Sequence, residues 1–298
     1  PNQPLVSVWI VTYKRDDTLL DALRKLAAST CPPQEIVIVD NVRSSSVPSR
    51  FEEFATPIEL LCPEGNVGCA GLNLAFERAS GKFIFCFDDD SFPAPDCIAN
   101  AVRAFESDAA LGMIGFKMHD PKTLQPWYDR WWNPDSKSAQ RTVFCPGCGL
   151  AFRNDARLPE EICVPDIISQ AHELSMAAEI LRLGYRVEFR PDCIAFHPDT
   201  TTGYFGEKAR SGNRNQLRLL IRYADALNLA VLLGSQLLWT ILRRPNEAGF
   251  AFDYFFPFIA VRFRGQWRNN SRKCFRGTRI LNSDGCCEFF CHRQFAIA

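Results

Sequence analysis

Three consecutive aspartates, Asp88, Asp89 and Asp90, directly follow the apolar run 83–87. That run has the composition of a strand buried on both faces. Carboxylates crowded at the end of a strand raise one another's pKa unless a counter-charge is present, and Mg²⁺ or Mn²⁺ supplies one through oxygen ligands. Because ligands of open α/β sheets bind beyond the carboxyl ends of the strands, we expect a metal–diphosphate site here. The alternative is a solvated acidic turn.

Strands alternate with helices through the first half of the sequence, and these elements would position the aspartates. The alternation predicts an α/β fold in which a mainly parallel central sheet with right-handed crossovers is flanked by helices. The expected strands cover 6–11, 35–39, 58–62 and 83–87, and the expected helices cover 16–28, 69–80 and 97–106.

The pattern loosens after an expected strand at 111–117. Trp127, Trp131 and Trp132 fall in a polar segment that we expect to be a loop. Their rings could stack on a sugar acceptor, or they could pack over the core. Gly147 allows close approach of the backbone and is a further candidate for acceptor binding.

Length and composition describe an ordinary globular protein. A chain of 298 residues can form one large domain or one domain with an appendage, and 47% hydrophobic with 23% charged residues is typical of such chains. The 34 Lys and Arg residues balance the 34 Asp and Glu residues, so the net charge does not predict a nucleic-acid partner. We expect no N-terminal signal peptide, because 6–11 has the pattern of a first strand.

Thirteen cysteines are scattered along the chain. Without a secretion signal, they favour reduced thiols in a cytoplasmic protein. Cys145 and Cys148 form a CxxC pair, and a zinc site joining them to the cysteines and histidine of 286–292 is one alternative. Buried thiols are the interpretation we favour, because the spacing matches no closed four-ligand pattern.

The C-terminal region differs in character from the rest. Residues 215–242 form a long apolar helical pattern, of which 228–242 is too short to span a bilayer alone. Over 210–279 basic residues outnumber acidic ones and are interleaved with aromatics. This favours an interfacial helix on a membrane surface. The alternatives are a core helix or the contact face of a homo-oligomer.

Four motifs occur in one order over roughly residues 5–225. They are Val6–Arg15, Ile36–Asn41, Asn66–Asn73 and the triple aspartate. Their order and spacing resemble family 2 glycosyltransferases of the inverting, metal-dependent type with the GT-A fold. One mild departure is Val11, where that family usually has proline.

The resemblance implies a nucleotide-diphospho-sugar donor, with UDP- or dTDP-sugars favoured. Asp40 would accept a hydrogen bond from a uracil or thymine N–H. Asp90 would ligate the divalent cation, Mn²⁺ or Mg²⁺, and Asp88 would contact the ribose or the donor sugar. The other residues expected to bind the nucleotide or donor are Thr12, Tyr13, Arg15, Asn66, Gly68, Asn73, Asp89 and Arg214.

A base must still deprotonate the acceptor hydroxyl. The family places an acidic pair at a helix start, about eleven residues before a Gly-Tyr-Arg turn. Here that turn begins at Gly184, after an expected helix at 171–183, so Glu173 becomes the base candidate. His172 is an alternative base or tunes Glu173, and Ser175 stands where many relatives carry an aspartate. An ordinary helix-cap His-Glu pair is the alternative.

A further histidine, His197, follows the next expected strand, which starts at 186. Relatives often carry a histidine there near the metal or diphosphate, so metal or phosphate contact is expected, with a structural histidine as the alternative. Arg210, Arg214 and Asn215 come next, and a guanidinium there could clamp phosphate or be surface-solvated.

Together the resemblance implies a GT-A catalytic domain at 1–212, with a nucleotide-binding half at about 1–110 and an acceptor-binding half at about 111–212. A helical extension at 213–298 follows. The expected activity is inverting sugar transfer to a hydroxyl acceptor in bacterial cell-surface glycan synthesis, on the cytoplasmic face of the inner membrane. A lipid-linked acceptor fits best. The alternatives are a tailoring enzyme for soluble small molecules and a catalytically silent sugar-nucleotide-binding protein.

Overall fold

The computed structural model describes residues 5–43, 48–126, 137–143, 145–164 and 171–198, with a few helical positions between 214 and 234. The chain forms two compact units, Pro1–Gly212 with Arg293–Ala298, and Asn213–His292. The strands and helices below belong to the first unit. The assignment of catalysis to 1–212 and of a membrane-surface role to 213–298 stays a prediction.

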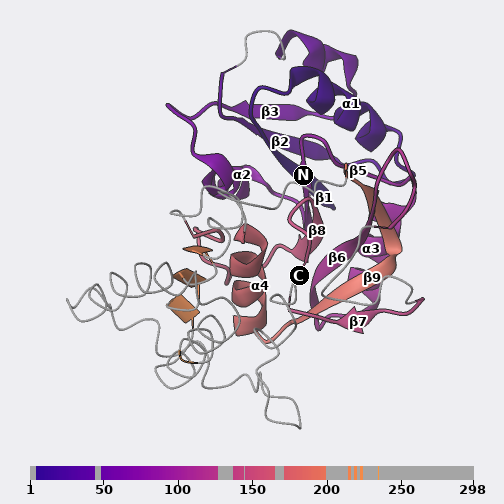
Figure 1. The fold of residues 1–298 in the computed structure, drawn as a ribbon, viewed down its shortest axis with the longest axis vertical. Coiled ribbons are helices and arrows are strands. Elements are labelled where there is room, and N and C mark those ends of the chain that lie inside the picture. The colour runs from indigo at the N-terminus through magenta and orange to yellow at the C-terminus, as the bar shows by residue number, and fades with distance from the viewer. Residues whose placement is uncertain are drawn as a thin grey trace, which may run out of the picture. The chain divides into compact units, whose positions relative to one another are not determined.

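One mixed sheet of nine strands forms the centre of the described first unit, in the order β3-β2-β1-β4-β8-β6-β9-β5, with β7 beside β9 (Figure 1). Pairing is parallel from β3 to β4 and between β6 and β9, whereas β8 runs antiparallel to both of its neighbours. The strands are β1 (Val6–Thr12), β2 (Glu35–Asp40), β3 (Ile58–Leu61), β4 (Phe83–Asp88), β5 (Phe92–Pro93), β6 (Leu111–His119), β7 (Gln140–Arg141), β8 (Gly149–Arg153) and β9 (Arg186–Phe196).

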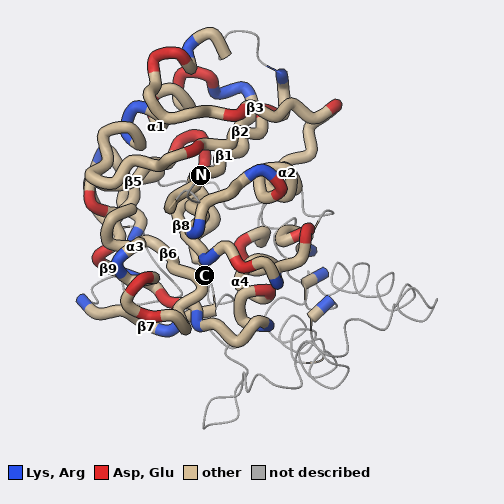
Figure 2. Tube along the Cα trace, turned by 180° about the vertical axis from the view of Figure 1, so that it is seen from behind, with Lys and Arg blue, Asp and Glu red and all other residues tan. Residues whose placement is uncertain are grey.

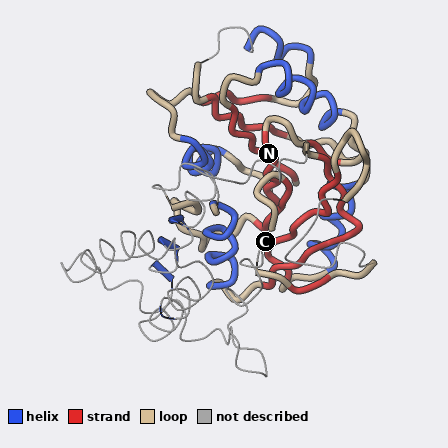
Figure 3. The backbone as a smooth tube through the Cα atoms, in the orientation of Figure 1, coloured by secondary structure: helices blue, strands red, loops and turns tan. Residues whose placement is uncertain are grey.

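Helices cover both faces of this sheet (Figure 3). Apolar residues of α1 and α3 pack into one core cluster and those of α2 and α4 into another, which places the two helix pairs on opposite faces. The helices are α1 (Asp16–Ala27), α2 (Gly71–Arg78), α3 (Cys97–Ser107) and α4 (His172–Arg182), with short 3-10 helices at Pro48–Glu53 and Gly68–Ala70. The predicted α/β architecture is confirmed.

Strand β4 shows why the run before the aspartates is so apolar. Phe83, Phe85 and Phe87 face the cluster of α1 and α3, while Ile84 and Cys86 face the cluster of α2 and α4. All five are essentially inaccessible to solvent. Because each large side chain contributes about 1.5–3 kcal/mol when fully buried, this strand is firmly held, and the three aspartates at its end have a rigid base.

Several expected elements differ in extent. The helix expected at 69–80 begins only at Gly71, because Gly68, at φ 57°, starts a 3-10 turn. The strand expected at 186–189 continues to Phe196. The cysteines of the described residues are free thiols, six of them buried. No helix in the described part of the chain is long and apolar enough to cross a membrane.

Charged residues of both signs are interspersed along the described first unit (Figure 2). The charge at the carboxyl edge of the parallel strands is therefore set by the individual residues that lie there. Trp127, Trp131, Trp132 and Arg210 lie outside the described residues, as does the cluster at 286–292, so their expected roles stay predictions.

Candidate functional site

The carboxyl ends of β1, β2 and β4 meet at one edge of the sheet. In the parallel register Thr12 lies beside Asp40, and Val11 lies beside Asp88. Segments that are far apart in sequence therefore deliver polar side chains to the same place. This is the position at which open α/β sheets bind ligands.

Asp89 fastens the turn after β1 to the end of β4. Its Oδ2 accepts a 2.8 Å hydrogen bond from the Thr12 hydroxyl and a 3.4 Å bond from the Tyr13 amide. Its Oδ1 accepts a 3.0 Å bond from the Arg15 guanidinium. Burial raises the pKa of Asp89, although Thr12 and Arg15 oppose this effect. The carboxylate is thus engaged by the protein, which makes Asp89 a positioning residue for Thr12 and Arg15.

Arg15 also forms a 2.5 Å ion pair with Asp90, while about half of its side chain stays exposed. Burial acts to raise the pKa of Asp90, but His197 and Arg15 outweigh it and hold that pKa below its ordinary value. Asp90 is therefore an anion in the described structure. Arg15 compensates much of the negative charge of Asp89 and Asp90 before any ligand arrives.

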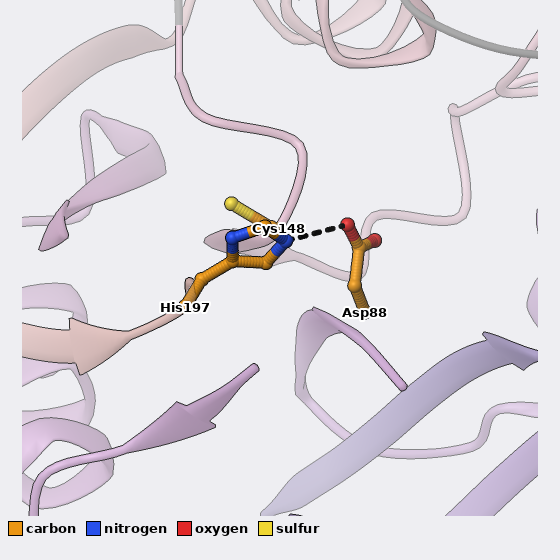
Figure 4. A group of neighbouring side chains, drawn as sticks. All are labelled: Asp88, Cys148 and His197. Carbon is orange, nitrogen blue, oxygen red and sulfur yellow. Dashed lines mark ion pairs between the residues drawn. The ribbon is translucent and has the colours of Figure 1, made fainter. Parts of the chain in front are cut away.

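His197, which follows β9, lies among the aspartates. Its Nε2 is 3.0 Å from Asp90 Oδ1 and 3.7 Å from Asp88 Oδ2. Asp88, Cys148 and His197 each offer one ligand atom, and these atoms all lie within 4.8 Å of one another (Figure 4). The sequence assigned the metal to Asp90 and the sugar to Asp88; the structure groups His197 with both.

The chemistry of these residues fits a divalent cation. The Nδ1 of His197 lies 2.6 Å from the Pro198 carbonyl, which can only accept, so Nδ1 carries the proton of the neutral ring. The lone pair of Nε2 then faces two carboxylates that also offer only lone pairs. Such a set needs either a proton or a cation at its centre. Carboxylate and imidazole ligands suit Mn²⁺ and related cations.

The base candidate lies in the first turn of α4. Glu173 and His172 are both buried, and Glu173 Oε2 is 3.4 Å from His172 Nδ1. Burial raises the pKa of Glu173, against the opposing effect of His172 and the backbone amides. Burial would lower the pKa of His172, but Cys69, Glu173 and Asp88 raise it overall. The pair therefore couples a basic carboxylate to an imidazolium near Asp88.

Ala171, which precedes this pair, has the left-handed conformation at φ 64°. That conformation costs a non-glycine residue about 1–2 kcal/mol. The surrounding packing holds it, since Ala171 is buried. The strained residue sets the direction in which α4 starts, and with it the position of Glu173.

Residues 7–154 match the sequence model of the family described as Glycosyl transferase family 2. This segment is a family 2 glycosyltransferase domain. It contains β1 to β4 and the triple aspartate, so the family recognised from the four motifs is confirmed. The positions of Glu173 and His197 lie beyond the matched segment.

Relatives of this chain occur in Bacillus subtilis (strain 168). YwdF, an uncharacterized glycosyltransferase, is 34% identical over 103 residues, which cover 34% of this chain and 38% of YwdF. TuaG, named provisionally as a glycosyltransferase of teichuronic acid biosynthesis, is 23% identical over 210 residues, covering 65% of this chain and 78% of TuaG. The chain thus spans well under two thirds of YwdF.

Solved structures share the fold. GalNAc-T7 with UDP, GalNAc and Mn²⁺ has a TM-score of 0.57 at 14% identity, over 76% of this chain and 49% of that chain. TarS of S. aureus has a TM-score of 0.55 at 17% identity, over 81% of this chain and 44% of that chain. At such identities the likeness shows the fold alone, and the predicted GT-A fold is confirmed.

Asn73 and Ser175 both hold the loop around Cys163 in place. Asn73 donates to the Cys163 carbonyl and accepts from the Cys163 amide, each at 2.9 Å. Ser175, on α4, donates to the Ile162 carbonyl at 2.9 Å and accepts from the Val164 amide at 3.2 Å. Ser175 therefore has a structural use, which explains why a serine can occupy the position where many relatives have an acid.

The remaining donor candidates form turns at the same edge. Asp40 is buried and its Oδ1 accepts a 2.8 Å bond from the Val42 amide. Asn66 accepts a 2.9 Å bond from the Gly68 amide, and Tyr13 is 47% exposed. Contact of these residues with a donor stays a prediction. The same holds for Arg214, which belongs to the second unit.

Two features were not expected from the sequence. Cys148 was expected to be an incidental thiol, yet it lies beside Asp88 and His197; its CxxC spacing was the available signal. Gly147, predicted to bind the acceptor, lies against His172 and Glu173, where an added Cβ would come within 2.6 Å of the imidazole and 3.2 Å of Glu173 Oε2. Its glycine identity follows from this packing.

Proposed function

We propose that this protein transfers a sugar from a nucleotide-diphosphate donor to a hydroxyl acceptor with inversion at the anomeric carbon. The observation that carries the proposal is the meeting of Asp88, Asp90 and His197 at the sheet edge, with a buried Glu173 electrostatically coupled to Asp88. Asp88, Asp90 and His197 can hold a cation and, through it, an anionic leaving group. Glu173 can take a proton from the acceptor.

The donor would lie over the carboxyl ends of β1, β2 and β4. Asp40 would accept a hydrogen bond from the base. Asp88, which the sequence assigned to the ribose or donor sugar, is reassigned to the cation because its Oδ2 lies 3.7 Å from His197 Nε2. UDP- or dTDP-sugars are favoured. Two structures of the same fold support this choice by their contents: GalNAc-T7 was solved with UDP, and TarS 1–349, with a TM-score of 0.53, was solved with UDP-GlcNAc.

Asp88, Asp90 and His197 would hold a divalent cation, Mn²⁺ or Mg²⁺. When bound, such a cation supplies Lewis-acid stabilisation of the charge that develops on a departing diphosphate. Arg15, whose side chain is about half exposed beside Asp90, would pair with an oxygen of the diphosphate. GalNAc-T7 supports the assignment, because it was solved with Mn²⁺.

Glu173 would act as the base in a single displacement. Its carboxylate takes the proton of the acceptor hydroxyl, the hydroxyl oxygen forms a bond to the anomeric carbon, and the bond from that carbon to the diphosphate oxygen breaks on the opposite face. The configuration inverts as a result. The raised pKa of Glu173 suits this role, since a base works best with a pKa close to the working pH. His172 would position and tune it.

For the acceptor we propose a growing bacterial cell-surface glycan, lipid-linked and reached from the cytoplasmic face of the inner membrane. The name of TuaG and the basic, aromatic composition of 210–279 support this choice. A tailoring enzyme for soluble small molecules is the alternative. If the purified protein does not bind anionic liposomes but glycosylates a soluble acceptor, the result would favour the tailoring enzyme.

The direct test supplies UDP-, dTDP- and GDP-sugars with Mn²⁺ and measures release of the nucleotide diphosphate. We expect turnover of at least one donor, which Asp90→Ala and Glu173→Gln reduce by about a hundredfold or more. Asp21→Asn, an exposed change on α1, serves as the matched control. Equal turnover in all four proteins would refute the site assignment. Binding without turnover in the wild type would favour the catalytically silent protein.

A further inference from the structure

Cys148 lies in the site although none of the four sequence motifs includes it. It lies in the loop leading into β8 and is 7% exposed. Its Sγ, a carboxylate oxygen of Asp88 and a ring nitrogen of His197 lie within 4.8 Å of one another (Figure 4). A cation at the centre of these atoms could contact all three after small side-chain rotations.

The surroundings of Cys148 are those of an incomplete ligand set. A thiol, a carboxylate and an imidazole lie together there, and each is a known cation ligand. A bound cation would deprotonate the thiol on coordination and would offset the charge of the two carboxylates.

The orientation of His197 also fits a cation. The Pro198 carbonyl lies 2.6 Å from Nδ1 and orients the ring, so that Nε2 faces the carboxylates. Metal-binding histidines are commonly fixed by such a hydrogen bond at the other nitrogen. In addition, that Nε2 lies 3.0 Å from the buried Asp90 Oδ1 and 3.7 Å from Asp88 Oδ2, so a cation bound there would take the place of the proton that these groups share.

We infer that Cys148 is a further ligand of this metal centre, beside Asp88, Asp90 and His197, and that it shifts the preference of the site from Mg²⁺ and Mn²⁺ toward thiophilic cations, above all Zn²⁺. Thiolate ligands select such cations, and Zn²⁺ also stands above Mn²⁺ in the general order of affinity. Formation of the sulfur–metal bond releases the thiol proton to solvent, with no change of oxidation state. The functional meaning rests on the proposed function: Zn²⁺ would displace the cation that assists transfer.

The test uses the full chain and Co²⁺ as an optical probe. We expect wild-type protein with one equivalent of Co²⁺ to show a near-ultraviolet sulfur-to-cobalt charge-transfer band. Cys148→Ser should lose this band, and Cys193→Ser should keep it, because Cys193 is equally buried in β9 but lies outside the group. A band that is absent from the wild type, or unchanged in Cys148→Ser, would overturn the inference.

Competition adds a second readout. Free Mn²⁺ is followed by electron paramagnetic resonance while Zn²⁺ is added, and we expect Cys148→Ser to weaken Zn²⁺ binding by about tenfold or more with Mn²⁺ binding nearly unchanged. If both serine variants lose their folded circular dichroism spectrum, zinc X-ray absorption of the wild type decides. One sulfur at about 2.3 Å among nitrogen and oxygen neighbours supports the site, and any other shell overturns it.

The two proposals can fail separately. If no donor is turned over but the cobalt band depends on Cys148, the proposed function fails and the metal site stands. If turnover depends on Asp90 and Glu173 but neither the band nor Zn²⁺ binding depends on Cys148, the function stands and this inference fails.

Discussion

Gly147 lies so close to His172 that a methyl group on its α-carbon would come within 2.6 Å of both Cε1 and Nε2 of the ring. The next residue along the chain, Cys148, lies beside Asp88 and His197. Two adjacent residues thus join the base candidate on α4 to the cation-binding candidates at the end of β4. A small displacement of this loop would disturb both.

Gly147→Ala should reduce turnover by about a hundredfold, because displacement of catalytic groups by about 1 Å can cost that much. The added methyl group must push the imidazole, and with it Glu173, away from its position. Steady-state kinetics with the best donor measure the effect. The matched control is Gly65→Ala, since an added Cβ there has no atom within 4 Å. Full activity of Gly147→Ala would contradict the packing argument.

The pH dependence of turnover should show the titration of Glu173. A base must be unprotonated, and burial raises the pKa of Glu173 above its ordinary value of 4.5. We therefore expect turnover to rise with pH through a limb that lies above 4.5 and then to level off. In Glu173→Gln the residual rate, lower by about 10²–10⁴-fold, should lack that limb. The same limb in the variant would assign it to another group.

Asp89→Ala should destabilise the fold by about 1–3 kcal/mol, because the buried Thr12 hydroxyl loses its acceptor. Asp89→Asn keeps an acceptor oxygen and should cost less. Urea unfolding measures both free energies. Asp21→Ala, on the exposed side of α1, should stay within about 0.5 kcal/mol of the wild type. If Asp89→Ala matches that control, Asp89 does not anchor the turn after β1.

Ser175→Ala should lower the free energy of unfolding by about 1–3 kcal/mol, since the Ile162 carbonyl and the Val164 amide lose their shared partner. Ser107→Ala, which removes a hydroxyl from the exposed end of α3, is the control. In Ser175→Ala the acidic limb of the pH profile of turnover should stay at the pH where the wild type has it. A shift of that limb would mean that Ser175 acts on Glu173 and not only on the loop.

The fold of the first half could be predicted because β1, β2 and β4 are buried on both faces and consist mostly of apolar residues. The polar residues at their ends, Asp40 and Asp88, then had to share one edge. The direction of β8 could not be predicted, since an apolar run such as 149–153 does not encode parallel or antiparallel pairing.

The sequence indicated which residues gather at this edge of the sheet, but not the contacts between them. Asp89 and Thr12 are 77 positions apart, so their hydrogen bond is a product of the sheet register. Ser175 was expected only as a departure from the aspartate of many relatives. Its structural role could not be predicted, because its partners lie in a loop whose sequence has no periodicity. Cys148 was set aside because the cysteine spacing matches no closed four-ligand zinc pattern, whereas its neighbours in the structure are a carboxylate and an imidazole.

The most direct test of the account is calorimetric titration of UDP and dTDP with and without Mn²⁺. In wild type and Glu173→Gln we expect Mn²⁺ to tighten binding of at least one nucleotide by about tenfold or more, equivalent to about 1.4 kcal/mol. In Asp90→Asn the gain should disappear. Binding that is indifferent to Mn²⁺ in the wild type, or equally enhanced in Asp90→Asn, would contradict a cation-assisted donor site at this edge of the sheet.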